Sequence, residues 1–148
     1  MYMEKPYLGT FTEGIFESLS VELLRGGTHR KDVVGVFCRP PRRDKGGFSH
    51  EMAMVIGQLR RTDAYIMGDF NVDLLKASTH GPTSDYLGEF KSAGFYPLVS
   101  LPTRLTNKMA TLIDNTWTNN IEANIGSCGP RDSESLRSSP GVCVCGWV

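Results

Sequence analysis

Hydrophobic and polar residues alternate along residues 18–24, which predicts a half-buried strand, and residues 32–38 are predicted to form its partner strand. The second segment is rich in β-branched residues, which favour strands. Residues 25–31 between them are polar and contain two glycines, as expected of a hairpin loop. Two prolines at positions 40 and 41 end the second strand, because proline has no backbone N–H to donate.

After these prolines, apolar residues recur at the spacing of a helix, which predicts two helices. Ser49 is a suitable N-cap, and apolar residues recur at helical spacing from Met52 to Leu59, interrupted by Gly57. A second helix is predicted over residues 83–93, with Gly94 placed to cap its C-terminus. The side chains expected to face the core are Met52, Val55, Ile56, Leu59, Leu87 and Phe90.

The other apolar segments complete a mixed α/β order. Residues 64–67 form a short apolar run, which predicts a strand buried on both faces. A short apolar piece follows at residues 95–101, then a turn at 102–104 and a last strand near 110–118. The predicted order is β-β-α-β-α-β-β, which belongs to the α/β (α+β) class.

The last part of the chain has a different composition. Within residues 126–148, Ser, Gly and Pro occupy 11 of 23 positions and no periodicity is present. Such a segment buries too little apolar surface to fold. We therefore expect residues 126–148 to be disordered, with the folded part ending near residue 125.

Composition and charge narrow the class of protein. A length of 148 residues suits one domain, and no apolar run reaches the roughly 18–20 residues of a membrane helix. The N-terminus has no signal-peptide pattern, so we expect an intracellular protein, nuclear or cytoplasmic and not secreted. The four cysteines form no CxxC pair and are expected to be free thiols.

The balance of 16 basic and 16 acidic residues means that any binding to nucleic acid must rest on a local patch. Residues 39–47 carry four basic side chains and one acidic side chain. This segment is either a solvated connector or a loop that faces phosphate.

The clearest chemical signal is Gly68-Asp69-Phe70-Asn71, directly after the buried strand. Side chains at the end of a strand lie at the rim of the sheet, where α/β proteins usually build their sites. Asp69 and Asn71 are two residues apart and project to the same side of an extended segment. An aspartate that holds a water or a metal, steadied by an amide, suits phosphodiester hydrolysis. An Asx-turn explains the same pair of residues.

Several separated motifs together resemble one family. In chain order they are VFCRPP at 36–41, IMGDFNVDLL at 66–75, GFYPL at 94–98, LPTR at 101–104, TLIDN at 111–115 and TNN at 118–120. This series is similar to the endonuclease/exonuclease/phosphatase superfamily, and within it to the apurinic-endonuclease-like domain of non-LTR retrotransposons. The resemblance covers about residues 17–125 and leaves residues 1–16 outside.

The resemblance implies a partial four-layer α/β sandwich that nicks target DNA with Mg²⁺, so that the reverse transcriptase of the element can prime. Asp69 would activate or orient the attacking water, and Asn71 would hold that geometry. Both are candidate metal ligands. Asp114 would orient a catalytic histidine, because a carboxylate fixes the tautomer of an imidazole.

Three further residues are candidates for binding the substrate. The resemblance implies that Thr103 contacts the scissile phosphate. Arg104 either binds phosphate in a bidentate manner or caps a turn. Arg39 lies in the VFCRPP motif and in the basic loop, and is the third candidate. DNA is the implied partner, and the sequence indicates neither a membrane nor a protein partner.

The chain also departs from the family pattern. No asparagine precedes Asn71, no glutamate lies in the family's metal-binding motif, and Cys38 stands where the family has tyrosine. The closing Ser-Asp-His is absent, and no histidine follows Asp114. The three histidines, at positions 29, 50 and 80, are expected to have surface roles.

Three functional hypotheses follow. The first is a truncated retrotransposon-type DNA endonuclease domain that is catalytically incomplete. The second is an active phosphodiesterase or phosphatase of the same superfamily, which requires a histidine within hydrogen-bond reach of Asp114. The third is a non-catalytic nucleic-acid-binding remnant that uses the basic loop, and salt-sensitive binding without cleavage would distinguish it.

Overall fold

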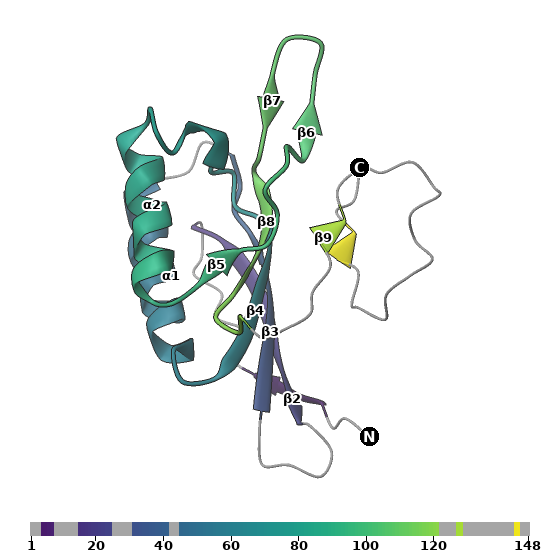
Figure 1. The fold of residues 1–148 in the computed structure, drawn as a ribbon. Coiled ribbons are helices and arrows are strands. Elements are labelled where there is room, and N and C mark those ends of the chain that lie inside the picture. The colour runs from purple at the N-terminus through teal and green to yellow at the C-terminus, as the bar shows by residue number, and fades with distance from the viewer. Residues whose placement is uncertain are drawn as a thin grey trace.

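The computed structural model describes residues 4–7, 15–24, 31–41, 45–121, 127–128 and 144–145. Most of the strands form one six-stranded sheet (Figure 1). Their order across the sheet is β1 (Glu4–Tyr7), β2 (Glu17–Leu24), β3 (Lys31–Cys38), β4 (Asp63–Asp69), β8 (Asp114–Thr118) and β5 (Tyr96–Pro97). Strands β3 and β4 are parallel, and every other neighbouring pair in this sheet is antiparallel.

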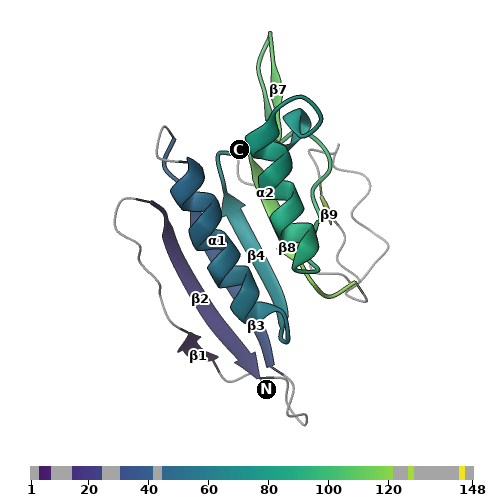
Figure 2. The same cartoon turned by 90° about the vertical axis from the view of Figure 1, so that its left-hand side faces the viewer.

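Helices α1 (Lys45–Leu59) and α2 (Gly81–Ser92) lie side by side on one face of the sheet (Figures 1 and 2). The core between helices and sheet is strongly aromatic. Its closest aromatic pair is Phe90 of α2 with Trp117 of β8, whose ring centroids are 4.2 Å apart, and both residues are 0% exposed. Large aromatic side chains bury much apolar area, so these rings contribute strongly to holding α2 on the sheet.

Among the described residues, no helix lies on the other face of the sheet (Figure 2). Side chains alternate along a strand, so Val33 and Phe37 of β3 are buried under α1 whereas Val34 and Val36 point the opposite way. Val36 is 48% exposed. The strand register places Leu19, Val36 and Met67 in one row across this open face. The fold class is confirmed, and the part of the chain that the structure describes forms one helix layer and one main sheet layer.

Most predicted elements are confirmed, with different bounds. Strands β2 and β3 and helix α2 match the periodic segments, and Gly94 has the positive φ of 84° expected after a helix. Met52 is buried in the core and Phe90 is fully enclosed, as expected.

Three local expectations were wrong. Ser49 lies inside α1 and is not its N-cap, because the helix begins at Lys45; the 1% exposure of Phe48 indicates that core packing extends the helix. Strand β4 is buried on one face only: Tyr65 and Met67 are half-buried, because both helices cover the opposite face. The predicted strand at 110–118 is interrupted at residues 112–113, where its first part turns into a separate hairpin.

That hairpin consists of β6 (Arg104–Leu105) and β7 (Ala110–Thr111). A short 3₁₀ helix, η1 (Leu74–Lys76), connects the end of β4 toward α2. In the region predicted to be disordered, β9 (Ser127–Cys128) pairs in parallel with β10 (Val144–Cys145), and the remainder lies outside the described residues. The boundary near residue 125 stays a prediction.

Within the described ranges, neither helix is long and apolar enough to cross a membrane. Cys38 is a free, exposed thiol, as expected. The side chains of the other three cysteines and the whole of the 25–30 loop, including His29, lie outside the described residues.

Candidate active site

The glycine of the Gly-Asp-Phe-Asn motif is required by close backbone packing. Gly68 has a φ of 145°, a conformation that L side chains rarely adopt. A Cβ at this position would lie 1.8 Å from the carbonyl oxygen of Phe37 on the neighbouring strand. Strand β4 thus approaches β3 closely just before Asp69, and this fixes where Asp69 leaves the sheet.

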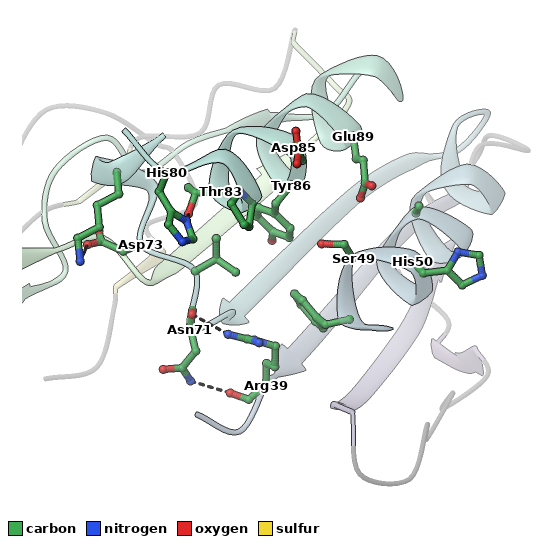
Figure 3. A pocket seen from close by; sticks show the side chains of 15 residues that line it. Arg39, Ser49, His50, Asn71, Asp73, His80, Thr83, Asp85, Tyr86 and Glu89 are labelled. Atoms are coloured by element: carbon green, nitrogen blue, oxygen red, sulfur yellow. Dashed lines mark hydrogen bonds and ion pairs between the residues drawn. The ribbon is translucent and has the colours of Figure 1, made fainter. Parts of the chain in front are cut away.

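A reciprocal set of hydrogen bonds then holds the loop after β4. The side-chain amide of Asn71 donates to the Arg39 carbonyl over 2.6 Å, and the Arg39 guanidinium donates to the carbonyls of Asn71 and Phe70, each over 2.8 Å (Figure 3). The backbone N–H of Asn71 donates to Asp69 Oδ1 over 2.9 Å. This is the Asx-type contact that the spacing allowed. Asn71 has a φ of 50°, which an asparagine tolerates better than most residues.

Arg39 therefore positions the loop rather than standing free at the surface. It is 2% exposed, and its side chain also packs over the Phe48 ring at 5.1 Å. The main-chain bonds explain why an arginine is buried at the end of β3: its N–H groups satisfy carbonyls that the turn leaves without strand partners. Contact between Arg39 and a substrate stays a prediction.

Asp69 and Asp114 are brought together by the sheet. They are direct register partners on the antiparallel strands β4 and β8, and Cys38 is the partner of Asp69 on the other side. Directly opposite residues on such strands have Cβ atoms about 4.5–5.5 Å apart. Both aspartates follow the alternation of the open face, so the helix layer does not cover them.

Thr103 acts on the backbone that carries Asp114. Its hydroxyl oxygen accepts from the N–H groups of Ile113 and Asp114, over 3.4 and 3.3 Å. Its own N–H donates to the Thr111 carbonyl. Arg104, the next residue, is exposed on the hairpin. The structure therefore gathers all six candidate site residues at the same end of the sheet, and their catalytic and binding roles stay predictions.

The pKa of Asp69 lies above the usual value of an aspartate. Burial has the largest effect and raises the pKa of Asp69, and the negative charge of Asp114 raises it as well. The hydrogen bond from the Asn71 N–H and the positive charges of Arg104 and Arg39 lower this pKa. Burial and then the charges of Asp69 and Glu17 also raise the pKa of the Cys38 thiol. This thiol is therefore a poor nucleophile at neutral pH.

Asp69→Asn is expected to raise the melting temperature at pH 7. The folded pKa of Asp69 lies above its unfolded value of about 3.9, so the stability gained from its protonated form is lost as pH rises through the folded pKa. An asparagine at position 69 has no carboxyl group to ionise, so this loss of stability does not occur, and its side-chain oxygen can still accept from the Asn71 N–H. Thermal melts at pH 3 and pH 7 check this: the gain should be present at pH 7 and absent at pH 3. An equal shift at both values would contradict it.

The two carboxylates are a chemically suitable pair for Mg²⁺, which often binds through one or two carboxylates together with waters and substrate phosphates. Asp114 raises the pKa of Asp69, because the two negative charges repel each other. A bound cation would reduce this repulsion. In the described part of the chain, no group of three or more His, Cys, Asp or Glu side chains lies close enough to hold a metal. Any metal here would rely on Asp69 and Asp114.

The described histidines lie elsewhere. His50 and His80 line a cavity of about 700 Å³ on the helix side of the sheet, whereas Asp114 belongs to the open face (Figure 3). His80 Nδ1 is 2.9 Å from Thr83 Oγ1. An active phosphodiesterase would need a histidine within hydrogen-bond reach of Asp114, and neither of these two histidines meets that condition.

Sequence reasoning missed one residue that organises this end of the sheet. Asp73 Oδ1 accepts from the N–H groups of Leu112 and Leu75, over 3.0 and 3.3 Å. The first bond ties the loop after β4 to the segment before β8. The second caps η1, and an aspartate before a helical turn is the signal that could have revealed this role.

The fold is similar to that of two solved proteins. The endonuclease domain of TRAS1, a telomere-specific non-LTR retrotransposon, superposes with a TM-score of 0.60 and 12% identity, covering 78% of this chain and 53% of that one. TDP2 of D. rerio, humanized by 14 mutations, superposes with a TM-score of 0.51 and 11% identity, covering 79% of this chain and 51% of that one. No family model and no curated protein matches the sequence.

The chain thus spans about half the length of each of these two structures. At such low identity the likeness concerns the fold, and the expected architecture is confirmed at that level. The protein shares the fold of the TRAS1 endonuclease domain and of TDP2 over about half of each of those chains.

Proposed function

We propose that this chain forms part of a retrotransposon-type, Mg²⁺-dependent DNA endonuclease domain and that it is catalytically incomplete as it stands. The observation that carries the proposal is the pairing of Asp69 and Asp114 at the end of the sheet, where the Asp69 carboxylate accepts from the Asn71 N–H and the Thr103 hydroxyl accepts from the Asp114 N–H. Support for DNA as the substrate class comes from the fold likeness and from the motifs around these residues.

The residues present would perform part of phosphodiester hydrolysis. Asp69, with its raised pKa, would accept a proton from an attacking water. Asp114 would orient an imidazole, and neither His50 nor His80 is placed to provide it. A bound Mg²⁺ would supply charge stabilisation at the phosphate. The carboxylates of Asp69 and Asp114 would be its protein ligands, and the imidazole that Asp114 would orient is missing among the described residues.

The β6–β7 hairpin supports contact with DNA. It projects beyond the end of the sheet at which β8 begins with Asp114 (Figure 1). Arg104 and Lys108 on it are exposed, and the charge of Arg104 lowers the pKa of Asp69. A phosphate bound to Arg104 would therefore lie within electrostatic range of the carboxylates.

Arg104→Ala is expected to weaken binding to duplex DNA and to reduce the slope of log K against log salt by about 0.9, the contribution of one phosphate contact. Fluorescence anisotropy with a labelled duplex at several salt concentrations measures both quantities. The matched control is Arg60→Ala, because Arg60 follows the C-terminal end of α1, away from the hairpin. Equal losses in the two variants, or binding insensitive to salt, would contradict the proposal.

A further inference from the structure

Three of the four cysteines lie near the end of the chain, at positions 128, 143 and 145. The fold brings two of them together, although they are far apart in sequence. Strand β9, labelled in Figure 1, pairs in parallel with β10, and Cys128 and Cys145 are direct register partners in this pair. Neither residue belongs to the candidate active site, so the proposed function leaves this pair unexplained.

The backbone spacing of the two partners suits a disulfide bond. Neighbouring strands of a sheet lie about 4.7–4.9 Å apart, and the Cα atoms of disulfide-bonded cysteines are usually about 4.4–6.8 Å apart. Residues alternate between the two faces of a sheet along each strand, so register partners on adjacent strands lie on the same face. The pairing of β9 with β10 therefore places Cys128 and Cys145 within the range that a disulfide requires.

The β9–β10 sheet is also too small to be stable through its hydrogen bonds alone. Each strand has two residues, and the pair is separate from the six-stranded sheet. Isolated pairs of strands are marginally stable, and closing the connection between them costs chain entropy. This connection, residues 129–143, is rich in serine, glycine and proline. A covalent bond between the register partners would stabilise the pairing, because it restricts the unfolded chain.

We propose that Cys128 and Cys145 are a redox-active pair that forms a disulfide within the chain when a low-molecular-weight disulfide, such as oxidised glutathione, is present. The thiolate of one cysteine attacks a sulfur of the oxidant, and one glutathione leaves as its thiol. The second cysteine attacks the protein sulfur of this mixed disulfide and releases the second glutathione. Two protein thiols become one disulfide, and one glutathione disulfide becomes two thiols, which take up both protons. Excess reduced glutathione reverses the reaction.

Oxidised glutathione added to the reduced full chain tests this proposal. Mass spectrometry of the intact protein is expected to show a monomer that has lost two hydrogen atoms. Trypsin cleaves after Arg131 and Arg137, so it separates Cys128 and Cys145 into different peptides. Without reductant these two peptides are expected to stay linked, and a reductant should release them.

Two serine variants locate the bond. Cys145→Ser is expected to abolish the linked peptides, whereas Cys143→Ser, the matched control two positions away, is expected to give them in the same yield as the native chain. All three cysteines follow the last strand of the six-stranded sheet in sequence, so both variants are expected to melt at the native temperature. A linkage that survives in Cys145→Ser and disappears in Cys143→Ser would overturn the assignment.

Oxidation in concentrated urea distinguishes a pair created by the fold from a chance encounter in a flexible chain. The linked peptides are expected in lower yield in urea, because unfolding separates β9 from β10. An equal yield in urea would overturn the proposal. Disulfides formed only between two chains, or glutathione adducts without linked peptides, would overturn it as well.

Discussion

A supercoiled plasmid incubated with the purified chain and Mg²⁺ is expected to remain supercoiled. Proton transfer by a placed side chain is worth about 10²–10⁴ in rate, and loss of one positioned donor removes a further factor of about 10²–10³ in comparable hydrolase sites. Asp69 and Asp114 are in place, but neither His50 nor His80 lies beside them. Members of one catalytic group act together, so a single missing member forfeits most of the acceleration.

The matched variant for this assay is Asp69→Ala, which is expected to be as inactive as the native chain. Agarose gels that resolve supercoiled, nicked and linear plasmid provide the measurement, with EDTA as the metal-free control. Nicking by the native chain that Asp69→Ala and EDTA both abolish would contradict catalytic incompleteness. It would then favour the active phosphodiesterase, with a histidine brought to Asp114.

Gly68→Ala is expected to destabilise the fold by at least about 3 kcal/mol, because the backbone angle is strained for alanine and the new methyl group meets the Phe37 carbonyl at 1.8 Å. Gly57→Ala provides the matched substitution. A Cβ at Gly57 meets nothing within 4 Å, and alanine is favoured in a helix by about 1 kcal/mol. Urea unfolding of both variants should therefore give shifts of opposite sign.

A Gly68→Ala chain that unfolds at the same urea concentration as the native protein would show that β3 and β4 do not approach so closely. A destabilised Gly57→Ala chain would show that Gly57 has a packing role that the open space around it does not indicate. The pair also distinguishes the two uses of glycine in this sequence. Gly68 is required by its backbone geometry, whereas Gly57 only weakens a helix.

The elements that were predictable are those with a local cause. Strand β2 follows from an alternation with period two, β3 follows from its β-branched residues, and α2 follows from helical spacing that ends in a glycine. The beginning of α1 was not predictable, because the burial of Phe48 against the sheet outweighs the weak helix preference of the two glycines before it. The break before β8 depends on Thr103 and Asp73, which are distant in sequence.

The sequence by itself determined the α/β class and the candidate pair Asp69 and Asn71, because periodicity and motif spacing are properties of neighbouring residues. Only the tertiary structure decided that Asp114 faces Asp69, that Arg39 is buried as a loop anchor, and that His50 and His80 lie across the sheet from the carboxylates. These relations join residues that are tens of positions apart. Strand register and helix packing fix them, because a shift of one residue turns a side chain to the other face of the sheet.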